Sequence, residues 1–486
     1  MRKLTSFCLA GLCAVCAVGT VGFGGCKNER SVNAKYEIVA ELVPETATVT
    51  GTLKLEYINS SAEEISELKF NLYPNAYRED AVYKAVAPAY EKEAYYQGES
   101  FGEIVVSSVN GARSWRIGGE DKNILCVELE ESIFPDEKTV VDIGFSTKLA
   151  SVDHRTGVAE RAVHLGNFYP QLCGRKDGAF VECVYYSDGD PFFSECADYK
   201  MTLLAPKEYL VASTCSVTAE RTLESKKEYT MSATNVRDVM IVASDDMQVK
   251  TEKVGGVTLK YYYLNEKSVE ERFQTVKECF SWFGEKFGAY PYAEYSVVET
   301  DFCYGGMEYP ALTLVDGKIE NGEFLRAVVH ETAHQWWYAV VGSDQTTEAW
   351  QDEGLAEYSA ALFFDEHERY GLTKQVIVDE ALKGYREYFR VYGSAFGETD
   401  TRMSRSLAEY LSEYEYRSIA YDKGAVLFDF VFKSVGEKKF FAALKRYYKD
   451  NAFRVATPHD LVAAFERSGV DVAGLFDGFL NGKGVI

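Results

Sequence analysis

The feature that most constrains this chain is a pair of histidines four residues apart, with a glutamate between them and another further along. The run H-E-T-A-H at residues 330–334 is followed by Glu353. On an α-helix, side chains four residues apart lie on one face. On a helix, His330 and His334 can therefore both reach one tetrahedral metal ion.

The pattern indicates a catalytic zinc site. A catalytic zinc keeps three protein ligands and an open fourth position, so Glu353 is the candidate third ligand beside His330 and His334. Glu331 is then a candidate general base next to the open position. We predict one Zn²⁺ per chain. The alternative is a buried helix with two hydrogen-bonded histidines, but the chain has only six histidines, which makes a chance match rare.

Further segments carry a resemblance to a known family. Eighteen residues, 335–352, separate the second histidine from Glu353, and the sequence also contains G-G-M-E-Y-P at 305–310 and Y-D-K-G at 421–424. In this order they resemble the signatures of the M1 family of zinc metallopeptidases, the gluzincin aminopeptidases. Tyr309 departs from the family's G-x-M-E-N motif, which has Asn there.

The resemblance implies roles for residues of these motifs. It implies that Tyr421 stabilises the transition state, whereas without it a core aromatic would be the simpler interpretation. It implies that Glu308 recognises the free α-ammonium of a substrate and so restricts cleavage to the first residue. The alternative for Glu308 is a solvated loop acid. The same motif implies that the substrate is also bound by Gly305, Gly306 and Met307.

Two weaker expectations concern residues near the site. Glu357 lies four residues after Glu353, on the same helix face, and is a candidate carboxylate partner for a metal-bound histidine. Gln171 resembles, loosely, a family glutamine near the substrate.

The predicted fold class is α+β. From 34 to 252 short runs alternate polar and apolar residues, as at 48–57, which is typical of half-buried antiparallel strands. A β-sandwich or saddle domain is the expected assembly. From 253 to 486 the pattern becomes mixed, and the resemblance implies a thermolysin-like catalytic domain.

Helical spacing recurs in the second part. The segment Val269–Phe287 has Phe273, Val276, Phe280 and Phe283 on one face. Further helices are expected at 323–341, 354–370 and 418–435. The resemblance also implies a short form that lacks the helical domain covering the site in larger relatives, and hence a more open cleft.

The N-terminus predicts export. Arg2 and Lys3 precede an apolar stretch at 7–23, which is typical of a secretory signal. The stretch closes on F-G-G-C, which resembles a bacterial lipobox, so residues 1–25 are expected to be removed and Cys26 lipidated. Residues 26–33 would be a short linker. The protein would then lie outside the cytoplasm on the membrane surface, with a secreted protein or a retained transmembrane helix as alternatives.

The net charge bears on the binding partners, and the cysteines bear on possible disulfide bonds. The net charge of −23 argues against nucleic acid, which requires clustered Lys and Arg. Seven cysteines lie beyond Cys26; Cys183 and Cys196 could pair in an oxidising compartment, and buried free thiols are the alternative.

The sequence therefore predicts a zinc-dependent aminopeptidase that hydrolyses N-terminal residues of peptides. One alternative is a zinc endopeptidase or another hydrolase on the same fold. The other is a non-catalytic surface lipoprotein. The sequence carries no indication of oligomeric state.

Overall fold

The computed structural model describes residues 32–483, and these residues belong to one compact unit. The expected signal segment and Cys26 lie outside the described residues. Within the described range, no helix is long and apolar enough to span a bilayer.

The N-terminal part is built on a seven-stranded sheet. Alternation along β1 buries Ala34, Tyr36 and Ile38 and exposes the residues between them, as half-buried strands require. Neighbouring strands are antiparallel except β1 and β13, which pair in parallel. The strand order is β15 (Ser216–Thr222), β16 (Lys226–Val236), β13 (Ala197–Pro206), β1 (Ala34–Val43), β2 (Thr48–Ile58), β7 (Lys138–Lys148) and β4 (Glu103–Asn110).

This part also contains two four-stranded sheets. Their apolar faces and that of the large sheet share one buried cluster, which includes Leu53, Phe70 and Leu203. The first has the order β10 (Gln171–Leu172), β3 (Ile65–Asn71), β6 (Ile124–Ile133) and β5 (Ala112–Gly118). The second has the order β14 (Leu210–Ser213), β17 (Ile241–Ser244), β9 (Val163–Leu165) and β8 (Thr156–Val158). A small ribbon joins β11 (Arg175–Lys176) and β12 (Ala179–Phe180), and helix α1 is Glu91–Ala94.

The second part opens with a mixed five-stranded sheet. Its order is β18 (Gln248–Val254), β19 (Val257–Tyr263), β20 (Glu294–Thr300), β22 (Leu312–Asp316) and β21 (Gly306–Met307). Strand β18 contains the expected domain boundary at 252/253 and pairs with β19. The domain limits stay a prediction.

Helix α2 (Val269–Phe287) connects β19 to its parallel neighbour β20, because parallel strands need a crossover. Its bounds are those predicted. The apolar face predicted for it is buried, with Phe273 3%, Val276 0%, Phe280 5% and Phe283 0% exposed.

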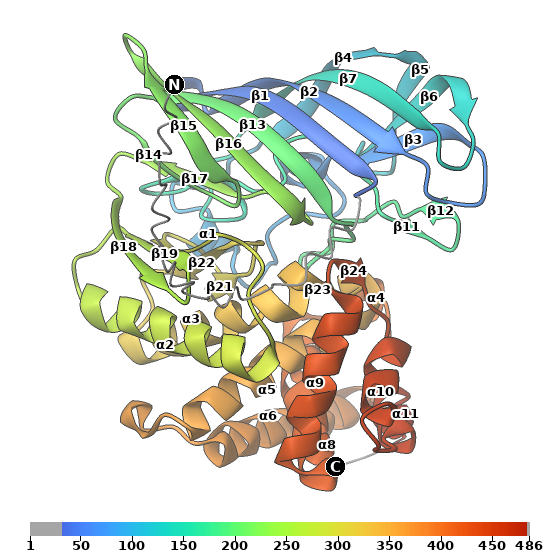
Figure 1. Cartoon of the computed structure of the whole chain (residues 1–486), viewed down its shortest axis with the longest axis vertical. Helices are drawn as coiled ribbons and strands as arrows, with labels where there is room; N and C mark the ends of the chain where they lie inside the picture. The colour runs from blue at the N-terminus through green and yellow to red at the C-terminus, as the bar shows by residue number, and fades with distance from the viewer. Residues whose placement is uncertain (1–31, 484–486) are drawn as a thin grey trace, which may run out of the picture. The chain divides into compact units, whose positions relative to one another are not determined.

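Helices dominate the rest of the chain, and Figure 1 shows them in the yellow-to-red part, after the blue-to-green strands. The α+β prediction is confirmed. The helices are α3 (Asn321–Ala333), α4 (Gln345–Glu348), α5 (Trp350–Asp365), α6 (Lys374–Phe396), α7 (Glu413–Arg417), α8 (Gly424–Val435), α9 (Glu437–Asn451), α10 (Pro458–Glu466) and α11 (Ala473–Leu480), and a short parallel pair joins β23 (Val341–Gly342) to β24 (Arg454–Val455).

The motif helix is shorter than the predicted 323–341. Helix α3 ends at Ala333, and a π-helical segment, Gln335–Val340, follows with Trp337 at φ −107° and ψ 51°. Arg237, from the N-terminal part, donates a hydrogen bond of 2.7 Å from Nε to the carbonyl oxygen of Tyr338. Tertiary contacts thus take this segment out of the helix, although its side chains remain buried.

The other two predicted helices also differ at their ends. The helix expected at 354–370 is α5, which begins at Trp350 and ends at Asp365. The helix expected at 418–435 is divided, with a π-helical segment Ser418–Lys423 before α8.

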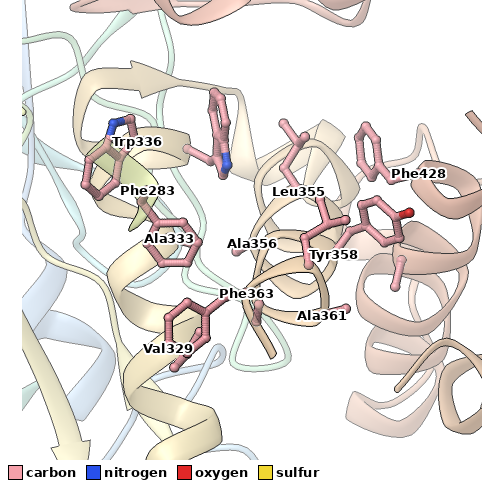
Figure 2. Close-up of a cluster of buried hydrophobic side chains, with 14 of the residues drawn as sticks. Phe283, Val329, Ala333, Trp336, Leu355, Ala356, Tyr358, Ala361, Phe363 and Phe428 are labelled. Carbon is pink, nitrogen blue, oxygen red and sulfur yellow. The ribbon is translucent and has the colours of Figure 1, made fainter. Parts of the chain in front are cut away.

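Helix α5 is the centre of the second core. Side chains of α2, α3, α5 and α8 meet around it, as Figure 2 shows with Phe283, Val329, Leu355 and Phe428. Fourteen of its sixteen residues are buried, so the helix has no solvent face along most of its length. This packing fixes the position of Glu353 in its first turn.

Candidate metal centre and cleft

Two helix ends bring the predicted ligands together. His330 lies in the last turn of α3, His334 directly follows α3, and Glu353 lies in the first turn of α5. The two Nε2 atoms are 3.0 Å apart. Each lies 3.3 Å from Glu353 Oε2.

These residues fit a tetrahedral zinc ion. Ligand atoms about 2.0–2.1 Å from zinc in a tetrahedron lie about 3.3 Å from one another, which matches the three distances. Glu353 Oε2 is buried and makes no hydrogen bond within the part of the chain that the structure describes. Buried polar atoms are normally paired, so a cation at this point would satisfy the group.

Hydrogen bonds on the far side of each ring set the histidine tautomers. His330 Nδ1 lies 2.9 Å from Glu357 Oε2, which is where the sequence predicted a carboxylate partner. His334 Nδ1 lies 3.2 Å from the carbonyl oxygen of Trp337. Both acceptors require Nδ1 to carry the proton, so both Nε2 lone pairs are free to bind a metal.

Glu331 lies beside the predicted metal position. It belongs to a second buried group with Glu308 and His334, whose candidate ligand atoms lie within 4.8 Å of one another. Burial raises the pKa of Glu331 to about 7, against the opposing effect of the histidines. A carboxylate with this pKa can exchange a proton near neutral pH.

Gly306 allows Glu331 to approach the sheet. A Cβ atom at residue 306 would lie 2.5 Å from both Cγ and Oε1 of Glu331, closer than side chains tolerate. Strand β21, which contains Gly306 and Met307, is the edge strand of its sheet and pairs only with β22 among the described strands.

Glu308 follows this edge strand and is 3% exposed. Gln345 Nε2 donates a hydrogen bond of 3.0 Å to its Oε1. Burial, and then the charge of Asp190, raises the pKa of Glu308 well above its usual range. Tyr309, which stands in place of the family's Asn, turns away into the N-terminal part, where its hydroxyl donates to Asn167 Oδ1 at 3.3 Å.

Tyr421 lies in the π-helical segment before α8. Its ring stacks on that of His330, with centroids 5.7 Å apart and planes at 15°. Burial raises the pKa of Tyr421 well above its usual range, so the hydroxyl keeps its proton and remains a donor.

All nine predicted site residues line one cavity of about 570 Å³. The structure also places residues there that sequence reasoning missed, among them Arg155, Asp190 and Tyr416. No motif marked them: Arg155 and Asp190 come from loops of the N-terminal part, and Tyr416 lies in the short helix α7. Gln171, in contrast, does not line the cavity; its Nε2 donates to Ser194 Oγ at 3.0 Å inside the N-terminal part.

The cysteines of the described range are free. Cys183 and Cys196 are both buried and unpaired. Of the two possibilities predicted from the sequence, a disulfide between them or buried free thiols, the structure shows free thiols.

Comparisons with known proteins agree with the geometry. A sequence model of the peptidase family M1 domain matches residues 271–479. Leukotriene A-4 hydrolase of Xenopus laevis is 26% identical over 209 residues, which are 40% of this chain and 32% of that protein. Aminopeptidase N of Streptomyces lividans is 25% identical over 44% of this chain and 26% of that protein. The chain thus spans about a third or less of the length of these two relatives.

Solved structures share the fold over almost the whole chain. The M1 zinc metallopeptidase from Deinococcus radiodurans superposes with a TM-score of 0.66 at 15% identity, covering 93% of this chain and 94% of that one. At this identity the likeness shows the fold, with its two-domain arrangement of sheets and helices. Residues 271–479 thus match the peptidase family M1 domain, and the chain has the fold of the M1 zinc metallopeptidase from Deinococcus radiodurans.

Proposed function

We propose that the chain is a zinc-dependent aminopeptidase that removes N-terminal residues from peptides. One observation carries the proposal. His330, His334 and Glu353 present three ligand atoms at 3.0–3.3 Å from one another, in the same cavity as the buried acids Glu331 and Glu308. A solved structure of the Deinococcus radiodurans metallopeptidase holds a Tyr-Ser-Ala substrate, which supports a peptide substrate here.

The proposed chemistry is hydrolysis by water. Zinc held by the two histidines and Glu353 would supply a Lewis acid that polarises the carbonyl and acidifies water. Glu331 accepts the proton of the attacking water on its carboxylate and passes it to the leaving amine. Its pKa of about 7 suits both transfers.

Tyr421 assists the transition state. Its ring is stacked on His330, which directs the phenol toward the carbonyl that would be bound there. The hydroxyl donates a hydrogen bond to the oxygen that becomes negative as water adds. A donor prepositioned in a buried site stabilises that charge more than water does.

Glu308 defines the end of the substrate. Its carboxylate, held by Gln345, pairs with the α-ammonium of the first residue. Because Glu308 is buried at the end of edge strand β21, a chain that continued past the ammonium would place an uncharged amide against a buried carboxylate. That mismatch excludes internal peptide bonds.

The direct test is Glu331→Gln in protein that begins after Cys26. We expect one zinc per chain by atomic absorption, since Glu331 is not a ligand, and a fall in kcat of about 10²–10⁴. Glu323→Gln, two turns earlier on α3 and exposed, is the matched control and should retain the wild-type rate. Full turnover of Glu331→Gln at normal zinc content would contradict the proposal.

We further propose that the protein is attached by lipid on Cys26 to a membrane surface outside the cytoplasm. The apolar run at 7–23 and the F-G-G-C sequence at 23–26 support this. Two acyl chains give firm anchoring, where one chain binds only weakly.

The attachment test is fractionation of cells that express Cys26→Ala. We expect the variant to leave the membrane fraction while the wild type stays in it. A variant that remains membrane-bound would indicate a retained N-terminal helix instead, and a wild type found in the medium would indicate a secreted protein.

A further inference from the structure

The carbonyl that orients His334 belongs to a peptide unit between two anchored side chains. This peptide joins Trp337 to Tyr338 where the chain has left the helix, with Trp337 at φ −107° and ψ 51°. Its oxygen lies 3.2 Å from His334 Nδ1. On the Trp337 side, the indole Nε1 donates a hydrogen bond of 3.0 Å to Ser359 Oγ in α5. The direction of the carbonyl therefore also depends on what fixes Tyr338.

Two neighbouring residues of the N-terminal part hold Tyr338 at its backbone and at its side chain. Arg237 Nε donates a hydrogen bond of 2.7 Å to the Tyr338 carbonyl oxygen, and the Tyr338 hydroxyl donates one of 2.6 Å to Asp238 Oδ2. Arg237 and Asp238 lie in the loop between β16 and β17 and are 2% and 0% exposed. A residue fixed at its carbonyl and at the end of its ring leaves the preceding peptide little freedom to rotate.

The guanidinium of Arg237 is itself fixed. Its Nη1 donates to the carbonyl oxygen of Ser194 at 3.0 Å, and its Nη2 donates to that of Arg454 in β24. Gly342 in β23 makes room for it, because a Cβ atom there would lie 2.1 Å from Arg237 Cζ. The planar guanidinium donates in fixed directions, so it sets the positions of the carbonyl groups around it.

Packing alone would not require these charged groups. Burying a charge costs free energy, and apolar side chains of similar volume often hold buried surfaces together equally well. Burial raises the pKa of Asp238 to about 6, against the opposing effect of the Tyr338 hydrogen bond. What the polar groups add is a fixed direction for their partners, and the partner that they share is Tyr338.

We propose that Arg237 and Asp238 are positioning residues for the zinc ligand His334 and thereby raise the zinc affinity of the site. A correctly directed carbonyl keeps the proton on Nδ1 and presents the Nε2 lone pair to the metal. The inference rests on the proposed zinc site and extends it, since the N-terminal part then contributes to metal binding although it supplies no ligand. By linkage, bound zinc stabilises the same contact between the two parts.

The zinc affinity of Tyr338→Phe tests this without changing a ligand. The variant keeps the ring and loses the hydrogen bond to Asp238. Competition with a chelator of known affinity gives the zinc dissociation constant, and urea unfolding of the metal-free protein measures stability separately. We expect zinc binding to weaken about fivefold. This is less than the 10–100-fold cost of removing a direct partner of a metal-bound histidine, because the Trp337 carbonyl is still present.

Two further variants test the arginine and the carboxylate. Arg237→Lys keeps the charge but loses the planar set of donors, and we expect zinc binding to weaken about tenfold. Asp238→Asn keeps an oxygen that can accept from the Tyr338 hydroxyl. It should therefore bind zinc within about threefold of the wild type, although it removes a buried charge.

A second buried group of arginine, carboxylate and tyrosine supplies matched controls. The Tyr261 hydroxyl donates to Glu299 Oε2 at 2.6 Å, and Arg272 Nη1 donates to the same oxygen at 2.7 Å. All three side chains are buried, in β19, β20 and α2 rather than beside the segment after α3. Tyr261→Phe and Arg272→Lys should lower the stability of the metal-free protein as the test variants do, and leave the zinc dissociation constant within about twofold.

The outcomes separate this inference from the proposed function. A wild type that binds no zinc would overturn the proposed metal centre and this inference with it. Zinc binding in the wild type, with unchanged dissociation constants in Tyr338→Phe and Arg237→Lys, would overturn the inference alone. Equal weakening of zinc binding in the two control variants would assign the effect to lost stability and also overturn it. Binding by Asp238→Asn as weak as that of Tyr338→Phe would overturn the part assigned to Asp238.

Discussion

At the scale of single residues, the two histidines owe their orientation to acceptors outside the metal group. Glu357 lies at 2.9 Å from His330 Nδ1, and the carbonyl of Trp337 lies at 3.2 Å from His334 Nδ1. Because the helix ends after Ala333, the backbone carbonyl of Trp337 can turn toward His334 and accept its Nδ1 proton.

Glu357→Ala should weaken zinc binding by about 10–100-fold, the usual cost of removing such a partner. The ring of His330 would lose its fixed orientation and part of its basicity. The measurement is zinc competition with a chelator of known affinity. Glu380→Ala is the control, because Glu380 lines the same cleft but pairs with Arg326. Equal zinc affinity of Glu357→Ala and wild type would contradict this role.

Tyr421→Phe should lower kcat by about 10²–10³, the usual effect of losing one oxyanion donor. KM and zinc content should change little, because the ring and its stacking on His330 remain. Steady-state kinetics with one reporter peptide measures both constants. Tyr414→Phe, on the exposed side of α7, should match the wild type. An unchanged kcat in Tyr421→Phe would remove Tyr421 from the mechanism.

At the scale of elements, two glycines explain how the ligand helix and the tyrosine segment meet. A Cβ atom at Gly424, the first residue of α8, would lie 2.7 Å from the Cα atom of Gly354 in α5. The helices cross at this backbone contact. This contact between the helices holds Glu353, the residue before Gly354, close to the segment that contains Tyr421.

Gly424→Ala should therefore force α5 and α8 apart. We expect a loss of about 1–3 kcal/mol in the free energy of unfolding, typical of overpacking, and a lower kcat because Glu353 and Tyr421 shift. Denaturant unfolding measures the first effect. Gly478→Ala in α11 has no atom within 4 Å of the new Cβ and should be neutral or slightly stabilising. If Gly424→Ala were as stable as Gly478→Ala, the contact would not constrain the crossing.

The elements also show where sequence patterns suffice. The bounds of α2 follow from its apolar face and were predicted correctly. The end of α3 was not predicted correctly. The chain leaves the helix near Trp337 because Nε of Arg237, about one hundred residues earlier, donates a hydrogen bond to the carbonyl oxygen of Tyr338. Apolar spacing continues past Ala333 and carries no sign of that bond.

In the whole molecule, the metal ligands that spacing predicts lie on one stretch of chain, whereas two of the cavity residues that it misses lie in the N-terminal part. His330, His334 and Glu353 follow from helix geometry and motif spacing. Arg155 and Asp190 reach the same cavity from the N-terminal part through folding that no local pattern records. The sequence therefore predicts the chemistry at the metal more fully than the walls that select the substrate.

Cleavage of matched peptides with free and N-acetylated ends by the zinc-loaded protein shows whether hydrolysis requires a free N-terminus. Mass spectrometry of the products identifies each bond that is cut. We predict stepwise removal of residues from the free N-terminus. Acetylated peptides should be cleaved at least about 100-fold more slowly, because Glu308 would face an uncharged amide. Equal cleavage of both sets, at internal bonds, would contradict the account and make the protein an endopeptidase.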